Sequence, residues 1–257
     1  MPHADAGPQR LVLAHGFTQT ARSWETFERL LRTRLPEAET LAVDLPGHGD
    51  APPPPDSDLW TSADRLVEAG GVGTYVGYSM GGRVSLHAAL AHPDAVQRLV
   101  LIGATAGIDD SDERAARRLA DDQLADHIET VGVPTFIDEW LSNPLFAGLT
   151  DATAQRSDRL RNTSPGLAAS LRSTGTGTQT PLWDRLGEIG CPALVLVGEH
   201  DAKFTALGQR LVDGLPEGEL VVVPGAGHSV HLEQPDATIE AITSWVDQIT
   251  SRVRPLM

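Results

Sequence analysis

Short hydrophobic runs alternate with longer amphipathic stretches along most of this chain. Each run is nearly continuous in valine, leucine and isoleucine and is bounded by glycine, proline or aspartate. This composition is typical of strands that helices cover on both faces, because a strand with one face in water alternates apolar and polar residues. We therefore expect an α/β fold with a mostly parallel sheet flanked by helices. The expected strands are residues 10–14, 40–43, 74–77, 98–102, 193–197 and 220–223.

The alternation stops between residues 108 and 180. No strand-like run occurs there, and the pattern predicts helical pieces broken by Pro134, Pro144 and Pro165. Because strand-like runs resume afterwards, we interpret the segment 108–180 as a helical cap inserted into the fold. Residues 1–107 and 181–257 then form the core. A length of 257 residues suits one domain with such an insertion.

Charge and cysteine content narrow the classes of partner and compartment. The formal charge is −15 at pH 7, whereas surfaces that bind nucleic acid or anionic lipid need basic patches. We therefore expect neither nucleic acid nor a membrane as a partner. Cys191 is the single cysteine, which fits a reducing compartment. Because the chain shows neither a signal-peptide pattern nor an apolar stretch of roughly 18 to 20 residues, we expect a cytoplasmic protein.

A Gly-x-Ser-x-Gly sequence at residues 77–81 is the strongest sign of chemistry. It directly follows an expected strand and opens a helix-like stretch at residues 82–90. In that setting the glycines allow a turn too tight for side chains, so the Ser79 hydroxyl projects from the edge of the sheet. The N–H of Met80 then points at the reaction site. The alternative is a glycine-rich turn with an incidental serine.

A serine hydroxyl needs a histidine to take its proton and a carboxylate to orient that histidine. Of nine histidines, His228 follows the last expected strand on a loop at the carboxyl edge of the sheet, and His231 is the reserve candidate. Asp201 follows the strand at 193–197 at the same edge, although an aspartate there is also typical of a helix N-cap. Ser79, Asp201 and His228 are therefore the candidate catalytic residues.

Residues 15–17 lie at the end of the first expected strand. A serine enzyme with a turn of this kind takes the second N–H donor for its oxyanion from a loop at this place. We assign this donor to Phe17, beside the Met80 N–H. His15 is predicted to be a hydrogen-bonded structural side chain, and His48 to belong to a turn after the second strand.

Four motifs together resemble the α/β-hydrolase superfamily along nearly the whole chain. They are His-Gly-Phe at residues 15–17, Asp-Leu-Pro-Gly-His-Gly at 44–49, Gly-Tyr-Ser-Met-Gly-Gly-Arg at 77–83 and Gly-Ala-Gly-His at 225–228. The chain order Ser79, Asp201, His228 is the one that this fold uses. The resemblance implies an α/β-hydrolase fold with a catalytic triad and leaves the reaction open.

Motifs in and near the expected cap narrow the resemblance. Residues 113–117, 140, 144–146, 160–162 and 198–204 resemble the 2-succinyl-6-hydroxy-2,4-cyclohexadiene-1-carboxylate synthase family of menaquinone biosynthesis. These lyases eliminate pyruvate from 2-succinyl-5-enolpyruvyl-6-hydroxy-3-cyclohexene-1-carboxylate. The resemblance implies a substrate site lined by Tyr78, Arg83, Arg117, Trp140 and Arg161.

The implied substrate is a small polycarboxylate with three carboxylates, which suits arginine because a guanidinium binds a carboxylate bidentately. Arg83 lies four residues after Ser79 on the same helix face and can reach the site. Arginine is also generally preferred in this chain, since Lys203 is its only lysine, and acidic residues outnumber basic ones in the expected cap. The number of charged residues alone therefore does not indicate a carboxylate-binding site. The positions of the arginines within the motifs do favour such a site.

The lyase interpretation makes Ser79 a base. With help from His228 it would remove the proton α to the succinyl ketone, while the Phe17 and Met80 N–H groups hold the enolate oxygen. We expect no cofactor and no metal, because no zinc-ligand spacing, phosphate-binding loop or dinucleotide fingerprint occurs. One alternative is a hydrolase of carboxylic esters or carbon–carbon bonds with the same triad. Another is a ligand-binding protein that has kept the fold.

Overall fold

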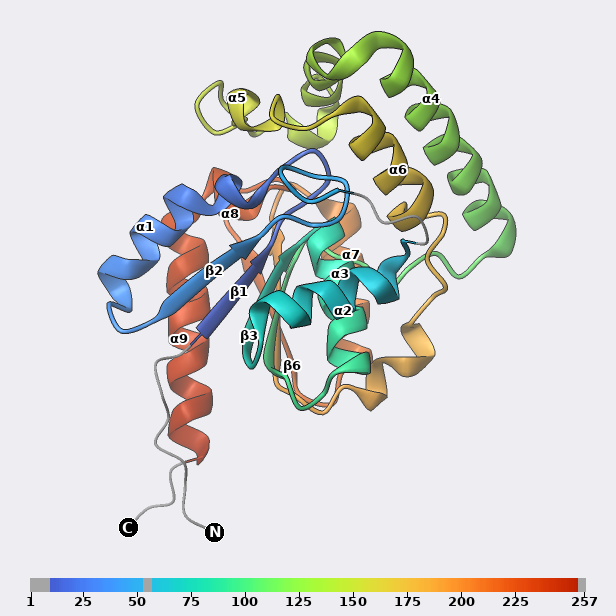
Figure 1. Ribbon diagram of the computed structural model, residues 1–257. Coiled ribbons are helices and arrows are strands. Elements are labelled where there is room, and N and C mark those ends of the chain that lie inside the picture. Colours follow the sequence, from blue (N-terminus) through green and yellow to red (C-terminus); the bar gives the residue numbers. More distant parts are fainter. Residues whose placement is uncertain (1–9, 53–56, 254–257) are drawn as a thin grey trace.

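Parallel strands form the centre of the molecule (Figure 1). The structure is a computed structural model and describes residues 10–52 and 57–253. Within these ranges a six-stranded sheet has the order β2-β1-β3-β4-β5-β6, and all neighbouring strands are parallel. Every expected strand is present, extended by no more than two residues. The bounds are β1 Arg10–Ala14, β2 Glu39–Val43, β3 Gly73–Tyr78, β4 Val96–Ile102, β5 Ala193–Gly198 and β6 Gly218–Val223.

Helices cover both faces of this sheet (Figure 1). α2 (Leu59–Gly70), α3 (Met80–Ala91) and α7 (Ala202–Gly214) pack on one face, and α1 (Glu25–Arg34) and α9 (Pro235–Val253) on the other. Shorter elements are η1 (Ala21–Trp24), η3 (Trp183–Glu188) and α8 (Val230–Glu233). Alternate residues of β1 face opposite cores: Val12 lies with α2 and α3, whereas Leu11 and Leu13 lie with α1 and α9. All three are fully buried, which explains the lack of alternation in the sequence.

A helical cap lies over the carboxyl ends of the strands, at the top of Figure 1. It contains α4 (Ser111–Leu141), η2 (Pro144–Phe146), α5 (Arg156–Arg159) and α6 (Ser164–Thr174). α4 and α6 share a small hydrophobic core, which includes Ile128, Phe136 and Leu167 and which Phe17 of the sheet edge also contacts. The cap is thus anchored on its own core and on the loop after β1. The exact domain boundary, residues 108–180, stays a prediction.

The prolines of the cap mark the starts of helical pieces. Pro134 lies within α4, but the backbone leaves the helical region at Gly132 (φ 78°, ψ 162°), so Pro134 falls in the first turn of the second half. Pro144 is the first residue of η2, and Pro165 is the second residue of α6. A proline in a first turn removes no hydrogen bond, because that N–H has no partner within the helix.

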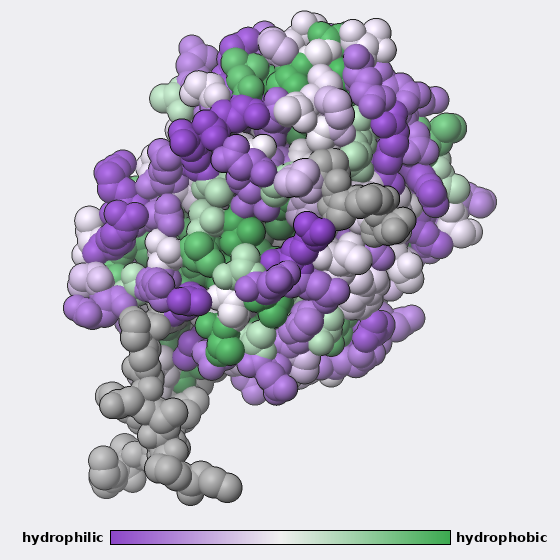
Figure 2. Space-filling view, in the orientation of Figure 1, coloured by the Kyte–Doolittle hydropathy of each residue, from purple (hydrophilic) through white to green (hydrophobic). Residues whose placement is uncertain are grey.

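Hydrophilic residues cover most of the face that Figure 2 shows. In the described ranges, the large hydrophobic side chains that are exposed are Val72, Leu119, Leu145 and Val222. None of the helices in residues 10–52 and 57–253 is long and apolar enough to cross a bilayer.

Candidate active site

Ser79 occupies a sharp turn between β3 and α3. Its backbone has φ 50° and ψ −105°, a conformation that costs a non-glycine residue about 1–3 kcal/mol and persists only where the surroundings hold it. The Ser79 N–H donates to Ile102 O (2.8 Å), and the Arg83 N–H donates to Ser79 O (3.1 Å). Glycine is required at position 77, because a Cβ there would collide with the carbonyl oxygen of Gly81. The turn presents the hydroxyl at the carboxyl edge of the sheet.

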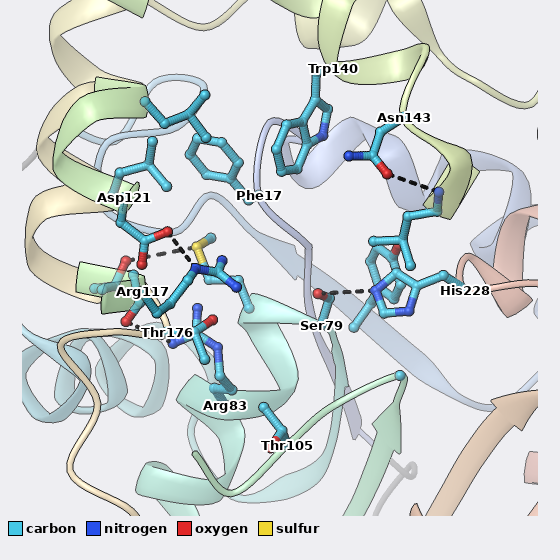
Figure 3. A pocket seen from close by; sticks show the side chains of 18 of the residues that line it. Phe17, Ser79, Arg83, Thr105, Arg117, Asp121, Trp140, Asn143, Thr176 and His228 are labelled. Atoms are coloured by element: carbon cyan, nitrogen blue, oxygen red, sulfur yellow. Dashed lines mark hydrogen bonds and ion pairs between the residues drawn. The ribbon is translucent and has the colours of Figure 1, made fainter. Parts of the chain in front are cut away.

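Three side chains that are distant in sequence meet at this edge. His228 Nε2 lies 3.3 Å from Ser79 Oγ (Figure 3), and His228 Nδ1 lies 2.8 Å from Asp201 Oδ2. Because the carboxylate can only accept, Nδ1 carries the proton and Nε2 is free to take the serine proton. Asp201 also caps α7, since its Oδ1 accepts from the Phe204 N–H at 3.1 Å. Asp201 is thus both the carboxylate partner of His228 and the N-cap of α7.

The loop that carries His228 is fixed by Glu233, a residue that no sequence motif marked as functional. The Glu233 carboxylate accepts from the N–H groups of Gly227 (2.7 Å) and Ser229 (2.9 Å), on either side of His228. The reserve candidate His231 lies instead between the rings of Trp24 and Tyr78. Within the described residues neither of its ring nitrogens has a hydrogen-bond partner. The structure therefore places His228, and not His231, against Ser79.

The two predicted oxyanion donors lie beside Ser79. Phe17 and Met80 line the same cavity as Ser79 and His228. In the part of the chain that the structure describes, neither backbone N–H donates a hydrogen bond. Both amides are therefore available to an oxygen of a bound molecule.

The cavity has a volume of about 420 Å³ and is rich in cations. Arg83, Arg117, Arg159 and Lys203 line it, together with the carboxylate of Asp121. Asp121 Oδ1 is already bound by Arg117 Nε at 2.7 Å. Figure 3 shows Arg83 and Arg117 on one side of Ser79 and His228 on the other. This arrangement leaves positive charge for an anionic ligand.

Two of these arginines are almost completely buried. Burial is the main cause that lowers the pKa of Arg83 to about 10 and that of Arg159 to about 10, with the neighbouring Arg117 adding to the effect on Arg83. Both guanidinium groups therefore remain protonated at neutral pH. Among the residues that the structure describes, the Arg83 guanidinium has one hydrogen bond, to Gly175 O at 3.4 Å, so its charge is largely unsatisfied by the protein.

Arg161 is not where the resemblance implied. Of the five implied substrate-binding residues, Tyr78, Arg83, Arg117 and Trp140 line the cavity, but Arg161 does not. Arg161 instead lies 3.6 Å from Asp50 and is about one-third exposed. Arg159, two residues earlier, points inward from α5. Because α5 is only four residues long, no periodicity shows which of its side chains face the core.

Aromatic side chains form the other wall of the cavity. The Trp140 ring lies 5.4 Å from the Phe17 ring and 5.6 Å from the Phe146 ring. The Tyr78 hydroxyl is hydrogen-bonded to Ser229 Oγ at 2.8 Å, and burial raises the Tyr78 pKa. Tyr78 is therefore a neutral part of the wall.

Buried histidines make the stability of the protein depend on pH. Burial is the largest cause that lowers the pKa of His15, His48, His87 (to about 4) and His231 (to about 3). These residues stay neutral in the folded protein, whereas the unfolded chain takes up protons near pH 6.5. The contribution of these neutral histidines to the free energy of unfolding is therefore fully present above about pH 6.5, and it is lost as the pH falls.

We expect the free energy of unfolding in urea to drop between pH 7.5 and pH 5.5. His87 and His231, whose pKa values in the folded protein are about 4 and about 3, each contribute about 1.4 kcal/mol to this drop. His231→Phe removes one of them, so the drop should be smaller by about that amount. An identical drop in both proteins would contradict the assignment of a neutral, buried His231.

The chain belongs to the alpha/beta hydrolase family, whose model matches residues 11–241. Within this family it is similar to the putative 2-succinyl-6-hydroxy-2,4-cyclohexadiene-1-carboxylate synthase of Bacillus subtilis (strain 168). The two are 36% identical over 248 residues, which cover 90% of this chain and 89% of the relative. The synthase of Serratia proteamaculans (strain 568) is 33% identical over 238 residues, covering 88% of this chain and 89% of the relative.

Solved structures show the same fold. MenH from S. aureus has a TM-score of 0.86 and 29% identity, with 96% of each chain covered. A malate-bound esterase from Thermogutta terrifontis has a TM-score of 0.77 and 25% identity, covering 94% of this chain and 90% of the esterase. The chain is an enzyme of the α/β-hydrolase superfamily and is related to the synthases.

Proposed function

We propose that this enzyme is a lyase of menaquinone biosynthesis. It would eliminate pyruvate from 2-succinyl-5-enolpyruvyl-6-hydroxy-3-cyclohexene-1-carboxylate, giving 2-succinyl-6-hydroxy-2,4-cyclohexadiene-1-carboxylate. The observation that carries the proposal is the presence, in one cavity, of the hydrogen-bonded Ser79–His228 pair and of buried arginines with few protein partners. The names of the relatives in Bacillus and Serratia supply the ring product, and the enolpyruvyl substrate is the one that the sequence resemblance implies.

Ser79 acts as the base in this proposal. His228 Nε2 takes the hydroxyl proton, and Asp201 stabilises the imidazolium that results. The Ser79 oxygen then removes the proton from the ring carbon that bears the succinyl ketone. The free N–H groups of Phe17 and Met80 hold the enolate oxygen that develops, as they would hold a tetrahedral oxyanion in an ester hydrolase.

Elimination follows by electron shifts within the substrate. The ketone re-forms, a double bond forms between ring carbons 2 and 3, and the original double bond moves to carbons 4 and 5. The bond from carbon 5 to the enolpyruvyl oxygen breaks. The leaving enolate takes up a proton, which the His228 imidazolium can return, and becomes pyruvate. No water is added to the ring.

The cationic side chains match the three carboxylates of this substrate. Arg83 and Arg117 form one cationic wall, and Arg159 provides a second buried guanidinium. A guanidinium binds a carboxylate bidentately, and the pair is stronger where water is excluded. Arg159 therefore takes the role that the resemblance had implied for Arg161. Lys203 lines the same cavity but is exposed.

Hydrolysis of a carboxylic ester is the second candidate. The strained Ser79 and the two free amides would also support attack on a carbonyl and an acyl-enzyme. The esterase from Thermogutta terrifontis has the same fold. The arginines favour an anionic substrate over a neutral ester.

Release of pyruvate tests the proposal. Purified protein is incubated with the enolpyruvyl substrate, and pyruvate is followed through NADH oxidation by added lactate dehydrogenase. We expect turnover without any added metal or cofactor. No pyruvate release at micromolar enzyme would contradict the proposal, and a burst of p-nitrophenol from p-nitrophenyl acetate would favour the hydrolase.

A further inference from the structure

Thr18, next to the proposed oxyanion donor Phe17, has an unusual backbone. Its φ is 70°, although it is a β-branched residue, and it is fully buried. The Gln19 N–H donates to Gly16 O at 3.1 Å, so residues 16–19 form a tight turn with Thr18 in third place. Turns with a positive φ at this place normally have glycine there. Surrounding contacts must therefore hold the threonine in this conformation.

Every polar group of Thr18 is bound. Its N–H donates to His48 Nε2 at 3.4 Å, its hydroxyl accepts from Arg159 Nη1, and its carbonyl accepts from Asn162 Nδ2 at 2.7 Å. His48 follows β2, whereas Arg159 and Asn162 belong to the cap. The cap thus reaches directly into the turn that carries the Phe17 N–H.

Asn162 joins three parts of the molecule. Its Nδ2 donates to Thr18 O and to Arg159 O (3.0 Å), and its Oδ1 accepts from the Gly49 N–H at 2.9 Å. The side chain is 6% exposed. It therefore ties the cap to the loop after β1 and to the loop after β2.

We propose that Asn162 is a positioning residue for the oxyanion hole. By holding the Thr18 carbonyl, it keeps Thr18 at positive φ and so fixes the direction of the neighbouring Phe17 N–H. The hole is then complete only while this part of the cap is docked. The inference rests on the proposed use of the Phe17 N–H as an oxyanion donor.

Asn162→Asp tests this role with a change of one atom. The aspartate can still accept from Gly49, but it places an acceptor against the Thr18 carbonyl, where a donor is needed. A displacement of about 1 Å at a catalytic group can lower the rate about a hundredfold. We expect kcat for pyruvate release to fall about 10- to 100-fold and KM to change less than kcat, because Asn162 has no bond to Arg83 or Arg117 and contacts Arg159 only at its backbone oxygen.

Ser23→Ala is the matched control. Ser23 Oγ donates to Asp158 Oδ2 at 2.6 Å, in the same contact between cap and core, without touching Thr18. We expect kcat of Ser23→Ala to stay near that of the wild type. An equal loss in both variants would show that general docking of the cap matters, which would overturn the role of Asn162.

Thr18→Gly provides a rescue. Glycine adopts a positive φ without strain, so the turn should need Asn162 less. We expect the double variant Asn162→Asp, Thr18→Gly to recover part of the lost kcat. Wild-type kcat in Asn162→Asp, or no recovery in the double variant, would overturn the inference.

Hydrolysis of p-nitrophenyl acetate separates this inference from the proposed function. A tetrahedral oxyanion needs the same two N–H donors. If the wild type releases no pyruvate but hydrolyses the ester, and Asn162→Asp lowers that rate, the lyase proposal fails and the positioning role stands. A wild type that is inactive on both substrates would overturn both.

Discussion

Replacing Ser79 by alanine is expected to lower kcat for pyruvate release by about a thousandfold or more. Removing the nucleophile of a serine triad costs up to about a millionfold in a protease, and here the same oxygen would be the base that starts the elimination. The hydroxyl contacts His228 at 3.3 Å and is not proposed to bind a carboxylate. KM should therefore change much less than kcat.

Ser85→Ala is the control for this variant. Ser85 lies on the same helix, α3, is fully buried, and within the described residues its hydroxyl has no hydrogen-bond partner. Removing the Ser85 hydroxyl should leave kcat unchanged. A loss of kcat in Ser79→Ala alone would then come from the position of Ser79 and not from the removal of a buried serine hydroxyl as such. Pyruvate release by Ser79→Ala at more than about a tenth of the wild-type rate would contradict a base at this position.

Replacing Arg159 by methionine should weaken turnover at low substrate concentration. Methionine keeps part of the apolar stem but removes the charge, and a hydrogen bond to a charged group contributes about 1.5–3 kcal/mol. This corresponds to a loss of roughly 10- to 100-fold in kcat/KM. Because Arg159 also donates to Ala154 O (2.8 Å) and to Thr18, unfolding in urea must show that the variant is folded under the assay conditions.

Arg161→Met is the matched control, two residues away. Its pair with Asp50 is partly exposed, with 3.6 Å between the nearest atoms, and exposed pairs contribute only about 0–1 kcal/mol. We expect kcat/KM near that of the wild type. The opposite order, with Arg161 important and Arg159 dispensable, would support the substrate-binding role implied by the resemblance and contradict the one drawn from the cavity.

The strands and the Ser79 turn could be predicted because their causes are local. A run such as residues 193–197 is continuously apolar since helices bury both faces of β5, and glycine at position 77 is required by the close approach of the Gly81 backbone. The placement of His228 and Asp201 also followed from the sequence. Both residues lie on loops that follow strands, and in a parallel sheet these strand ends lie at one edge.

The cap could be predicted only in outline. Whether Arg159 or Arg161 faces the cavity depends on how a four-residue helix and the turn after it dock on the core, and so short a helix has no readable periodicity. The bond from Asn162 to Thr18 spans 144 positions, and neither residue type signals a partner at that distance. The formal charge of −15 likewise gives no hint of a cavity lined by cations, because the sum over the chain does not show where charges lie.

Mass spectrometry of the ring product tests elimination at Ser79 most directly. With the enolpyruvyl substrate and the wild-type protein, we predict pyruvate together with a ring product that keeps its succinyl group and equals the substrate minus pyruvate. Hydrolysis of the enol ether would also release pyruvate, but its ring product would be heavier by one water. A ring product with that extra water, or release of succinate, would contradict a lyase.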